Sequence, residues 1–356
     1  MKKPRNDAPW PDPFFGSNCP GSESLRRQGE QDKPQIGMAD HSEIARATAA
    51  GTVVMICGPT AAGKSGLALA LAEESGGVII NADSMQLYRD LRVLTARPDE
   101  AEMARAPHRL YGVIDGAERA SVAAWLAMVA EAVATARQDG CLPIIVGGTG
   151  LYFHAAIHGI APIPEVPEDI HADCRRQLVA QGGVAFRAAL AGLDPVTAER
   201  LHDGDSQRLV RAMGVVRATG RPLSEWQTGP HQGAIDGVPL RIAMMPPRDD
   251  LYRAIDRRFA MMMTGGAADE VAALTARDLD PSLPVMKAIG VREIIAMQAG
   301  EIAPSQAVEQ ASRDSRRYAK RQMTWIRNNF NAEITFSEQQ LERKTQDIFA
   351  ILSKTG

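Results

Sequence analysis

The amino-acid sequence predicts an α/β fold, in which a P-loop NTPase-like core with a parallel sheet carries an inserted all-helical domain. Three observations predict it. A G-x-x-x-x-G-K-S segment at residues 58–65 follows an apolar run at 53–57 and precedes an alanine- and leucine-rich run at 67–72. Strand-like and helix-like segments then alternate up to residue 146, as in a parallel sheet with covering helices. Residues 166–235 show helical patterns without convincing strands.

The predicted organisation has five parts along the 356 residues. The beginning of the chain is rich in Pro, Gly, Ser, Asp and Lys and has no periodic apolar pattern, which is typical of disorder. A proline-bearing segment at 162–167 indicates a linker into the helical stretch. The parts are a disordered extension at 1–47, the first part of the P-loop core at 48–165, a helical insertion domain at 166–235, the second part of the core with basic C-terminal helices at 236–330, and a C-terminal tail or helix at 331–356.

The elements of the core follow in order. Strands are predicted over 53–57, 78–80 and 143–146, and helices after residue 64 and over 122–137. A short apolar run at 240–245 returns the chain to the sheet, and residues 251–327 are mostly helical in pattern. The loops at 81–84 and 147–150 follow the carboxyl ends of two strands, where ligands bind in open α/β sheets. We therefore expect both loops to face the glycine-rich segment.

The glycine-rich segment is a complete phosphate loop and predicts a bound diphosphate. Strand, loop and helix N-terminus aim successive backbone N–H groups and the positive end of the helix dipole at a phosphate. Lys64 supplies a positive charge, and Ser65 supplies a hydroxyl for Mg²⁺, which is the cofactor we predict. The predicted residues that bind the diphosphate or nucleotide are Gly58, Pro59, Thr60, Ala61, Ala62, Gly63, Lys64 and Ser65.

Other polar side chains near these loops suit such a ligand. Asp83 closes the second strand, where a carboxylate can act as a base or cap the next helix. Thr149 can donate its hydroxyl to a phosphate or a base, or mark a glycine-flanked turn. Arg208 and Arg211, if they face the cleft, can neutralise charge on a leaving diphosphate. No second acid follows Asp115, the nearest candidate for a Walker-B carboxylate, which argues against an ATP hydrolase.

The composition predicts a cytoplasmic protein without a membrane partner. The chain is 45% apolar, but no run approaches the roughly 18 consecutive apolar residues of a membrane span. The N-terminus lacks the apolar middle of a secretory signal. The scattered cysteines form no C-x-x-C pair, which argues against a zinc knuckle. Nothing in the sequence fixes the oligomeric state, and a monomer is the default expectation.

The net charge is −3, yet nucleic-acid binding needs only a local basic surface, and two segments supply one. Residues 208–221 carry four arginines and no acidic residue. In a helix over 313–327, basic residues fall on one face and apolar residues lie roughly opposite. A solvated helix face is the ordinary alternative to an RNA contact. This basic stripe consists of Arg313, Arg317, Lys320, Thr324 and Arg327.

Eight short segments occur in a family-specific order. They are GPTAAGKS at 58–65, NADSMQLY at 81–88, TARP at 95–98, PHRL at 107–110, VGGTGLY at 146–152, DSQRLVRA at 205–212, AIG at 288–290 and KRQMTW at 320–325. With this order and spacing, the chain resembles the tRNA dimethylallyltransferases from about residue 52 to residue 327. Eight ordered segments are far more specific than the phosphate loop alone.

The resemblance implies transfer of the dimethylallyl group from dimethylallyl diphosphate to the exocyclic N6 amine of the adenosine 3′-adjacent to the anticodon in tRNA, with Mg²⁺. It implies that the helical insertion holds the anticodon stem-loop. The catalytic residues it implies are Asp83 as the general base, Lys64, Thr149, and Arg211 beside the diphosphate. The tRNA-contacting residues it implies are Asp83, Ser84, Met85, Gln86, Thr149, Gln207, Arg208, Leu209, Val210 and Arg211.

Two positions depart from the family pattern. His171 stands where many relatives have an arginine, so we expect a weaker or pH-dependent tRNA contact at this residue. Ala62 stands where serine is usual, which removes a hydroxyl but leaves the backbone cradle intact.

Three other functions remain open at this point. An adenylate isopentenyltransferase would use the same donor with free AMP, ADP or ATP, although the helical insertion and the basic segments favour tRNA. A small-molecule P-loop kinase would transfer phosphate from ATP to a metabolite hydroxyl. A non-catalytic RNA-binding module would have no need of an intact Lys64, Ser65 and Asp83.

Overall fold

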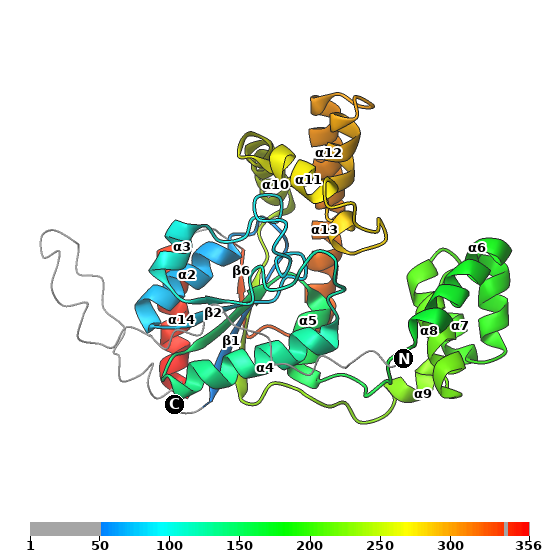
Figure 1. The fold of residues 1–356 in the computed structure, drawn as a ribbon. Helices are drawn as coiled ribbons and strands as arrows, with labels where there is room; N and C mark the ends of the chain where they lie inside the picture. Colours follow the sequence, from blue (N-terminus) through cyan, green and yellow to red (C-terminus); the bar gives the residue numbers. More distant parts are fainter. Residues whose placement is uncertain (1–50, 338–340, 356) are drawn as a thin grey trace, which may run out of the picture.

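The computed structural model of the chain describes residues 51–337 and 341–355 (Figure 1). The predictions for residues 1–47 lie outside this part. Its centre is one six-stranded sheet of order β3-β2-β4-β1-β5-β6, in which every neighbouring pair is parallel. The strands are β1 Thr52–Cys57, β2 Val78–Asn81, β3 His108–Arg109, β4 Pro143–Gly147, β5 Val238–Met244 and β6 Ile334–Phe336. The predicted parallel α/β core is confirmed.

The central strands follow from their apolar sequences. Every residue of β1, β2 and β4 is buried, as expected for strands covered on both faces by helices. These three strands and β5 are the ones that the sequence predicts. The edge strands β3 and β6 were not predicted, because segments of two and three residues are too short to show a period. Residues 331–356 therefore add an edge strand as well as a terminal helix.

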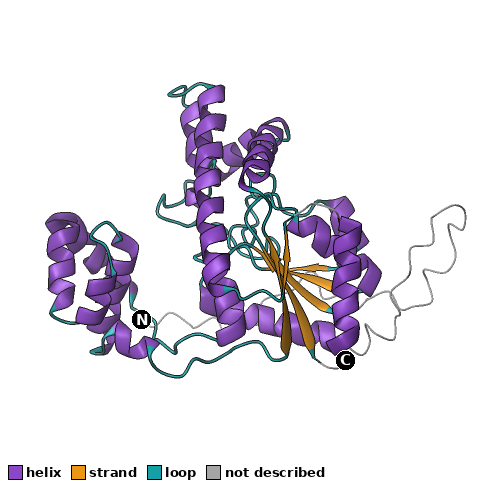
Figure 2. Cartoon of the chain, turned by 180° about the vertical axis from the view of Figure 1, so that it is seen from behind, coloured by secondary structure: helices purple, strands orange, loops and turns teal. Residues whose placement is uncertain are grey.

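Helices cover both faces of the sheet (Figure 2). On one face, α2 Lys64–Ser75 packs against α14 Leu341–Thr355, and their buried residues Leu67, Leu71, Ile348 and Leu352 share one hydrophobic cluster. The second cluster joins the other face to α4 and α5. The first face also carries α3 Glu100–Arg105, which contacts α2, and the second face carries α4 Val122–Gln138 and α5 Gly150–His158.

Four helices between β4 and β5 form a separate bundle, which stands to the side of the sheet in Figure 1. Phe186, Leu190, Leu209 and Met213 belong to its own hydrophobic cluster. The two segments that connect this bundle to the core pair with each other, since Ile160 and Gln232 form an antiparallel bridge. The helices are α6 Glu168–Ala191, α7 Pro195–Arg200, α8 Ser206–Thr219 and α9 Leu223–Gln227.

A third group of helices follows β5 and lies over the edge of the sheet where the strands have their carboxyl ends. The long helix α13, Pro304–Asn329, packs against α10, α12 and α5. Its buried face carries Ala319, Met323 and Ile326, while all five residues of the basic stripe are exposed. The predicted two-faced helix is thus confirmed. The other elements are α10 Arg248–Thr264, α11 Ala267–Thr275, the 3₁₀ turn η2 Val285–Lys287 and α12 Val291–Gln298.

Within residues 51–337 and 341–355, no helix is both long enough and apolar enough to cross a membrane.

Candidate active site

The phosphate loop joins β1 to α2 in the way that its sequence predicts. Gly63 precedes the helix with a φ of 83°, and Ala61 also has a positive φ of 63°. A Cβ atom at Gly58 would lie 2.8 Å from the Cβ atom of Met244 on β5, so this position has room only for glycine. The backbone can therefore come close to a phosphate over the whole turn.

Lys64 is held by the loop itself. Its Nζ atom donates a hydrogen bond to the carbonyl oxygen of Pro59 at 2.7 Å. Burial lowers the pKa of Lys64 to about 8; Asp83 and Cys57 oppose this shift, and Arg258 adds to it. Since the negative charge of Asp83 acts on this ammonium, the predicted base and the predicted phosphate loop belong to one electrostatic site.

The loops after β2 and β4 lie together, as expected for strand ends on one edge of a parallel sheet. The backbone N–H of Ser84 donates to the hydroxyl of Thr149 at 3.0 Å, and the backbone N–H of Thr149 donates to the carbonyl of Ala82 at 3.2 Å. One carboxylate oxygen of Asp83, Oδ1, accepts the backbone N–H of Met85 at 3.0 Å. The turn thus fixes the orientation of the Asp83 carboxylate.

Gln322, on α13, links the phosphate loop to the loop after β4. Its Oε1 atom accepts the backbone N–H of Thr60 at 2.9 Å, and its Nε2 atom donates to the carbonyl of Gly148 at 2.9 Å. A Cβ atom at Gly148 would lie 2.2 Å from Nε2, so glycine is needed for this contact. Gln322 is part of the KRQMTW segment, but its linking role was not predicted from the sequence.

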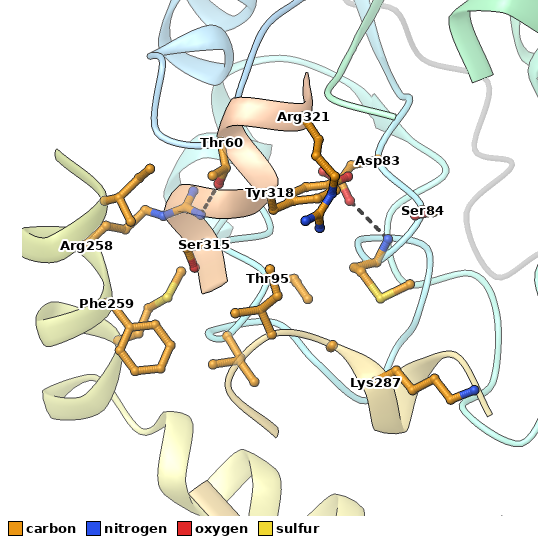
Figure 3. A pocket seen from close by; sticks show the side chains of 16 residues that line it. Thr60, Asp83, Ser84, Thr95, Arg258, Phe259, Lys287, Ser315, Tyr318 and Arg321 are labelled. Atoms are coloured by element: carbon orange, nitrogen blue, oxygen red, sulfur yellow. Dashed lines mark hydrogen bonds between the residues drawn. The ribbon is translucent and has the colours of Figure 1, made fainter. Parts of the chain in front are cut away.

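A cavity of about 320 Å³ opens beside these loops (Figure 3). Its polar end carries Thr60 of the phosphate loop and Asp83, whereas α10 contributes apolar side chains. Of the residues proposed from the sequence, it contains Thr60, Asp83, Ser84 and Met85. The full lining is Thr60, Asp83, Ser84, Met85, Leu94, Thr95, Ile255, Arg258, Phe259, Met262, Lys287, Ala288, Ile289, Ser315, Tyr318 and Arg321. The cavity can hold a ligand with one charged end and one apolar end.

Arg258 is a residue of this cavity that the sequence interpretation missed. It comes from α10, and its guanidinium donates a hydrogen bond to the hydroxyl of Thr60. Burial lowers the pKa of Arg258, while the carboxylate of Asp83 opposes the shift. One arginine among several on an amphipathic helix gives no sequence signal of its own, so only the fold identifies Arg258.

Tyr318 also faces the cavity and was not predicted. Burial raises the pKa of its phenol, Asp83 raises it further, and a hydrogen bond with Thr149 opposes the shift. The phenol therefore stays protonated at neutral pH and keeps a donor beside the predicted base.

The residues proposed on the helical bundle do not line this cavity. Gln207 and Arg208 are exposed at the start of α8, and Arg211 is partly exposed on the same helix. Arg211 does not line this cavity, whose polar end carries Arg258, and its place beside the diphosphate stays a prediction. One correction concerns two apolar residues of α8, since the side chains of Leu209 and Val210 are buried in the bundle.

His171, on α6, lies close to Arg211. Its Nδ1 atom is 2.8 Å from the Nη1 atom of Arg175, which makes Nδ1 the acceptor and leaves the ring neutral in this contact. Burial lowers the pKa of His171; Arg175, Arg119 and Arg211 add to this shift, and Glu168 opposes it. His171 and Arg211 therefore belong to one basic surface of the bundle.

The described residues contain no group of three or more His, Cys, Asp or Glu side chains that could hold a metal ion. Mg²⁺ is usually held by one or two protein oxygens together with substrate phosphates and water. Ser65 lies exposed in the first turn of α2, directly after Lys64. Its hydroxyl would be the protein ligand for a metal ion held on a bound diphosphate.

Comparison with known proteins identifies relatives over most of the chain. The family model described as IPP transferase matches residues 86–329. The tRNA dimethylallyltransferase of Rhodospirillum rubrum is 51% identical over 287 residues, which cover 80% of this chain and 88% of that protein. The tRNA dimethylallyltransferase of Parvibaculum lavamentivorans is 47% identical over 306 residues, with 86% and 97% covered.

Solved structures with a similar fold include two enzymes that act on tRNA. The full-length tRNA isopentenylpyrophosphate transferase from Bacillus halodurans superposes with a TM-score of 0.62 at 31% identity, covering 86% of this chain and 96% of that one. A eukaryotic dimethylallyltransferase acting on tRNA has a TM-score of 0.72 at 23% identity, covering 85% and 78%, which supports the fold alone. The chain belongs to the IPP transferase family, the family of the tRNA dimethylallyltransferases.

Proposed function

We propose that this enzyme transfers the dimethylallyl group from dimethylallyl diphosphate to the N6 amine of the adenosine 3′-adjacent to the anticodon of tRNA, with release of diphosphate. Family membership supports the reaction class. The observation that carries the proposal is a single cavity in which Asp83 lies near the phosphate loop and an apolar wall lies opposite. A base, a diphosphate cradle and an apolar pocket are the three parts that this reaction needs.

The polar end of the cavity suits the donor diphosphate. Arg258 supplies positive charge within the cavity, Lys64 supplies it from the adjoining phosphate loop, and the N-terminus of α2 supplies backbone N–H groups. As the bond between C1 of the allyl group and the bridging oxygen breaks, negative charge grows on the diphosphate. Groups already fixed around it stabilise that charge without reorganising. Arg258, which bonds to Thr60, is the proposed residue beside the leaving oxygen.

Asp83 is the proposed general base. The N6 amine of adenine is a poor nucleophile, because its lone pair is delocalised into the ring. It attacks C1 while the C1–O bond breaks, and the N6 proton passes to Asp83. Since Oδ1 of Asp83 already accepts the N–H of Met85, Oδ2 is the oxygen that we assign to this proton. Thr149 is proposed to hold the loop that carries Asp83, because its hydroxyl accepts the N–H of Ser84.

Mg²⁺ is the proposed cofactor, held by the hydroxyl of Ser65 and by the diphosphate. When bound, it neutralises charge on the leaving diphosphate. Lys64 in the phosphate loop and Arg258 in the cavity wall are proposed to stabilise the same charge from the protein side.

The adenosine must leave the stack of anticodon-loop bases to reach the cavity, as in other enzymes that act on a base. We propose that the helical bundle and the basic stripe hold the anticodon stem-loop, with Gln207, Arg208, Arg211 and His171 as bundle contacts. The exposure of Gln207, Arg208 and the stripe, and the partial exposure of Arg211 and His171, support this path. The proposed place of action is the cytoplasm, with the enzyme as a monomer.

Labelled dimethylallyl diphosphate tests the proposal directly. The purified protein is incubated with this donor and, in separate reactions, with unmodified tRNA, AMP or ATP. Label is expected in tRNA alone, and nucleoside analysis should place it on N6 of the adenosine next to the anticodon. Label in AMP or ATP with none in tRNA would identify an adenylate isopentenyltransferase and overturn the proposal.

A further inference from the structure

Glu270, on α11, uses both carboxylate oxygens to hold a distant backbone segment. Its Oε1 atom accepts the N–H groups of Arg92 and of Val93, the latter at 3.0 Å. Its Oε2 atom accepts the N–H of Leu94 at 2.9 Å. Residues 92–94 belong to no helix or strand, so ladder hydrogen bonds do not fix them. One side chain thus accepts the N–H groups of three consecutive residues, while the carbonyl oxygens of Arg92 and Val93 accept the N–H groups of Arg97 and Ala96.

This segment leads directly into the wall of the cavity. Leu94 and Thr95 line it, together with Phe259 on α10. Thr95 and Phe259 are labelled in Figure 3. Leu94 is wedged between neighbours, because a Cβ atom at Gly290 would lie 2.7 Å from Cδ1 of Leu94 and 3.0 Å from Cε2 of Phe259. A packed interior transmits small displacements. A shift of the Leu94 backbone therefore changes the shape of the apolar end of the cavity.

Contacts before and after residues 92–94 limit any backbone shift to these three residues. After it, the side-chain amide of Gln86 donates to the carbonyls of Thr95 at 2.9 Å and Ala96 at 3.0 Å. Before it, Arg277, just beyond the end of α11, donates to Asp90. With both flanks held, loss of the Glu270 contacts loosens residues 92–94 without releasing the whole loop.

We infer that Glu270 is a positioning residue that, by holding residues 92–94, sets the depth of the apolar end of the cavity and so selects dimethylallyl diphosphate over longer prenyl diphosphates. The inference rests on the proposed function for the identity of the donor. Glu270 itself does not line the cavity, and it acts through Leu94. Its effect is therefore expected in donor recognition more than in the chemical step.

Glu270→Gln is the sharpest variant, because it keeps the size of the side chain. It leaves one carbonyl oxygen and turns an NH₂ group toward a backbone donor, so at least one of the three bonds is lost. We expect KM for dimethylallyl diphosphate to rise several-fold, with a smaller change in kcat. The ratio of kcat/KM for dimethylallyl over geranyl diphosphate should fall by about tenfold, a modest part of what an apolar pocket discriminates.

Asp269→Asn is the matched control. Asp269 is the exposed neighbour of Glu270 on α11, and its substitution removes the same charge. This variant should keep the wild-type donor ratio. Hydrogen exchange supplies a readout that needs no activity, since the amides of residues 92–94 should exchange faster in Glu270→Gln than in wild type or Asp269→Asn.

The outcomes separate this inference from the proposed function. If wild type transfers neither donor to tRNA, the proposed function fails, while hydrogen exchange and calorimetric binding of the two diphosphates still test Glu270. Unchanged exchange at residues 92–94, or faster exchange with an unchanged donor ratio, would overturn the inference. If Glu270→Gln does not fold, Leu94→Ala opens the same wall directly. An unchanged donor ratio in that variant would also overturn it.

Discussion

The guanidinium of Arg258 donates a hydrogen bond to the hydroxyl of Thr60, although 198 positions separate the two residues in the sequence. This bond joins α10 to the phosphate loop and places a buried positive charge at the polar end of the cavity. Arg258→Ala should therefore lower kcat/KM for dimethylallyl diphosphate by a factor on the order of 10² to 10³, the usual cost of losing one preorganised donor to a developing negative charge. Single-turnover rates at saturating tRNA and varied dimethylallyl diphosphate measure this change in kcat/KM.

Two further variants test whether the effect is specific to Arg258. Arg257→Ala removes the same charge from the exposed neighbour on α10 and should leave the rate within a few-fold of wild type. Arg211→Ala changes the helical bundle, outside the cavity, and should also leave the rate at saturating tRNA nearly unchanged. If Arg211→Ala slowed single turnover more than Arg258→Ala, the assignment of the diphosphate contact to Arg258 would be wrong.

Asp83→Asn tests the general base with little change of shape. Asparagine keeps an Oδ1 acceptor for the N–H of Met85, so the turn after β2 should persist. Turnover should fall by a factor on the order of 10² to 10⁴, the worth of a positioned proton acceptor, while calorimetry shows nearly unchanged binding of dimethylallyl diphosphate. A rate within a few-fold of wild type would remove Asp83 from this role.

The lowered pKa of Lys64, about 8, predicts a pH dependence of donor binding. Lys64 is protonated below this pH and loses its charge as the pH rises through it. The anionic diphosphate favours the charged form, so donor binding should be tightest below pH 8, weaken above it, and take up protons near pH 8. Calorimetry in buffers of different ionisation enthalpy measures the proton uptake.

Lys64→Arg is the control for this titration, because arginine stays charged throughout the range. Its donor affinity should not depend on pH between about 7 and 9.5. The same dependence in wild type and Lys64→Arg would assign the titration to another group.

The sequence predicted the parts of the fold that have a clear local signal. The strand ends before Asp83 and Thr149 were predicted from short apolar runs, and their loops do bond to each other through Ser84 and Thr149. In a parallel sheet, this proximity follows from the strands alone. β3 and β6 escaped prediction because each relies on its neighbour in the sheet for hydrogen bonds and has almost no period of its own.

The site residues that the sequence did not predict were missed for a different reason. Arg258, Gln322 and Glu270 lie on helices far along the chain, and each reaches a loop more than 170 positions away. Helical periodicity shows which face of a helix is apolar, but it does not show which loop that helix will cover. The same limit explains the errors on α8, where Leu209 and Val210 were assigned with their polar neighbours although their side chains point into the bundle.

The basic stripe on α13 gives the last prediction, which concerns tRNA binding without chemistry. Lys320 and Arg327 are both exposed on the face opposite the buried residues Met323 and Ile326. If they contact tRNA phosphates, Lys320→Gln and Arg327→Gln should each weaken binding of all tRNAs alike. Each change should also flatten the plot of log K against log salt by about 0.7 to 0.9 per lost contact.

Arg105→Gln is the control for these two variants. Arg105 lies on α3, where it pairs with Glu73 at 2.7 Å, so its substitution removes one positive charge outside the proposed RNA path. A general effect of net charge would change all three variants equally, whereas phosphate contacts would change only the stripe variants. Filter binding at four salt concentrations is sufficient to compare the slopes. If both stripe variants kept the wild-type slope, the stripe would be a solvated helix face and the anticodon stem would have to be held by the helical bundle, where Arg208 and Arg211 are the next residues to change.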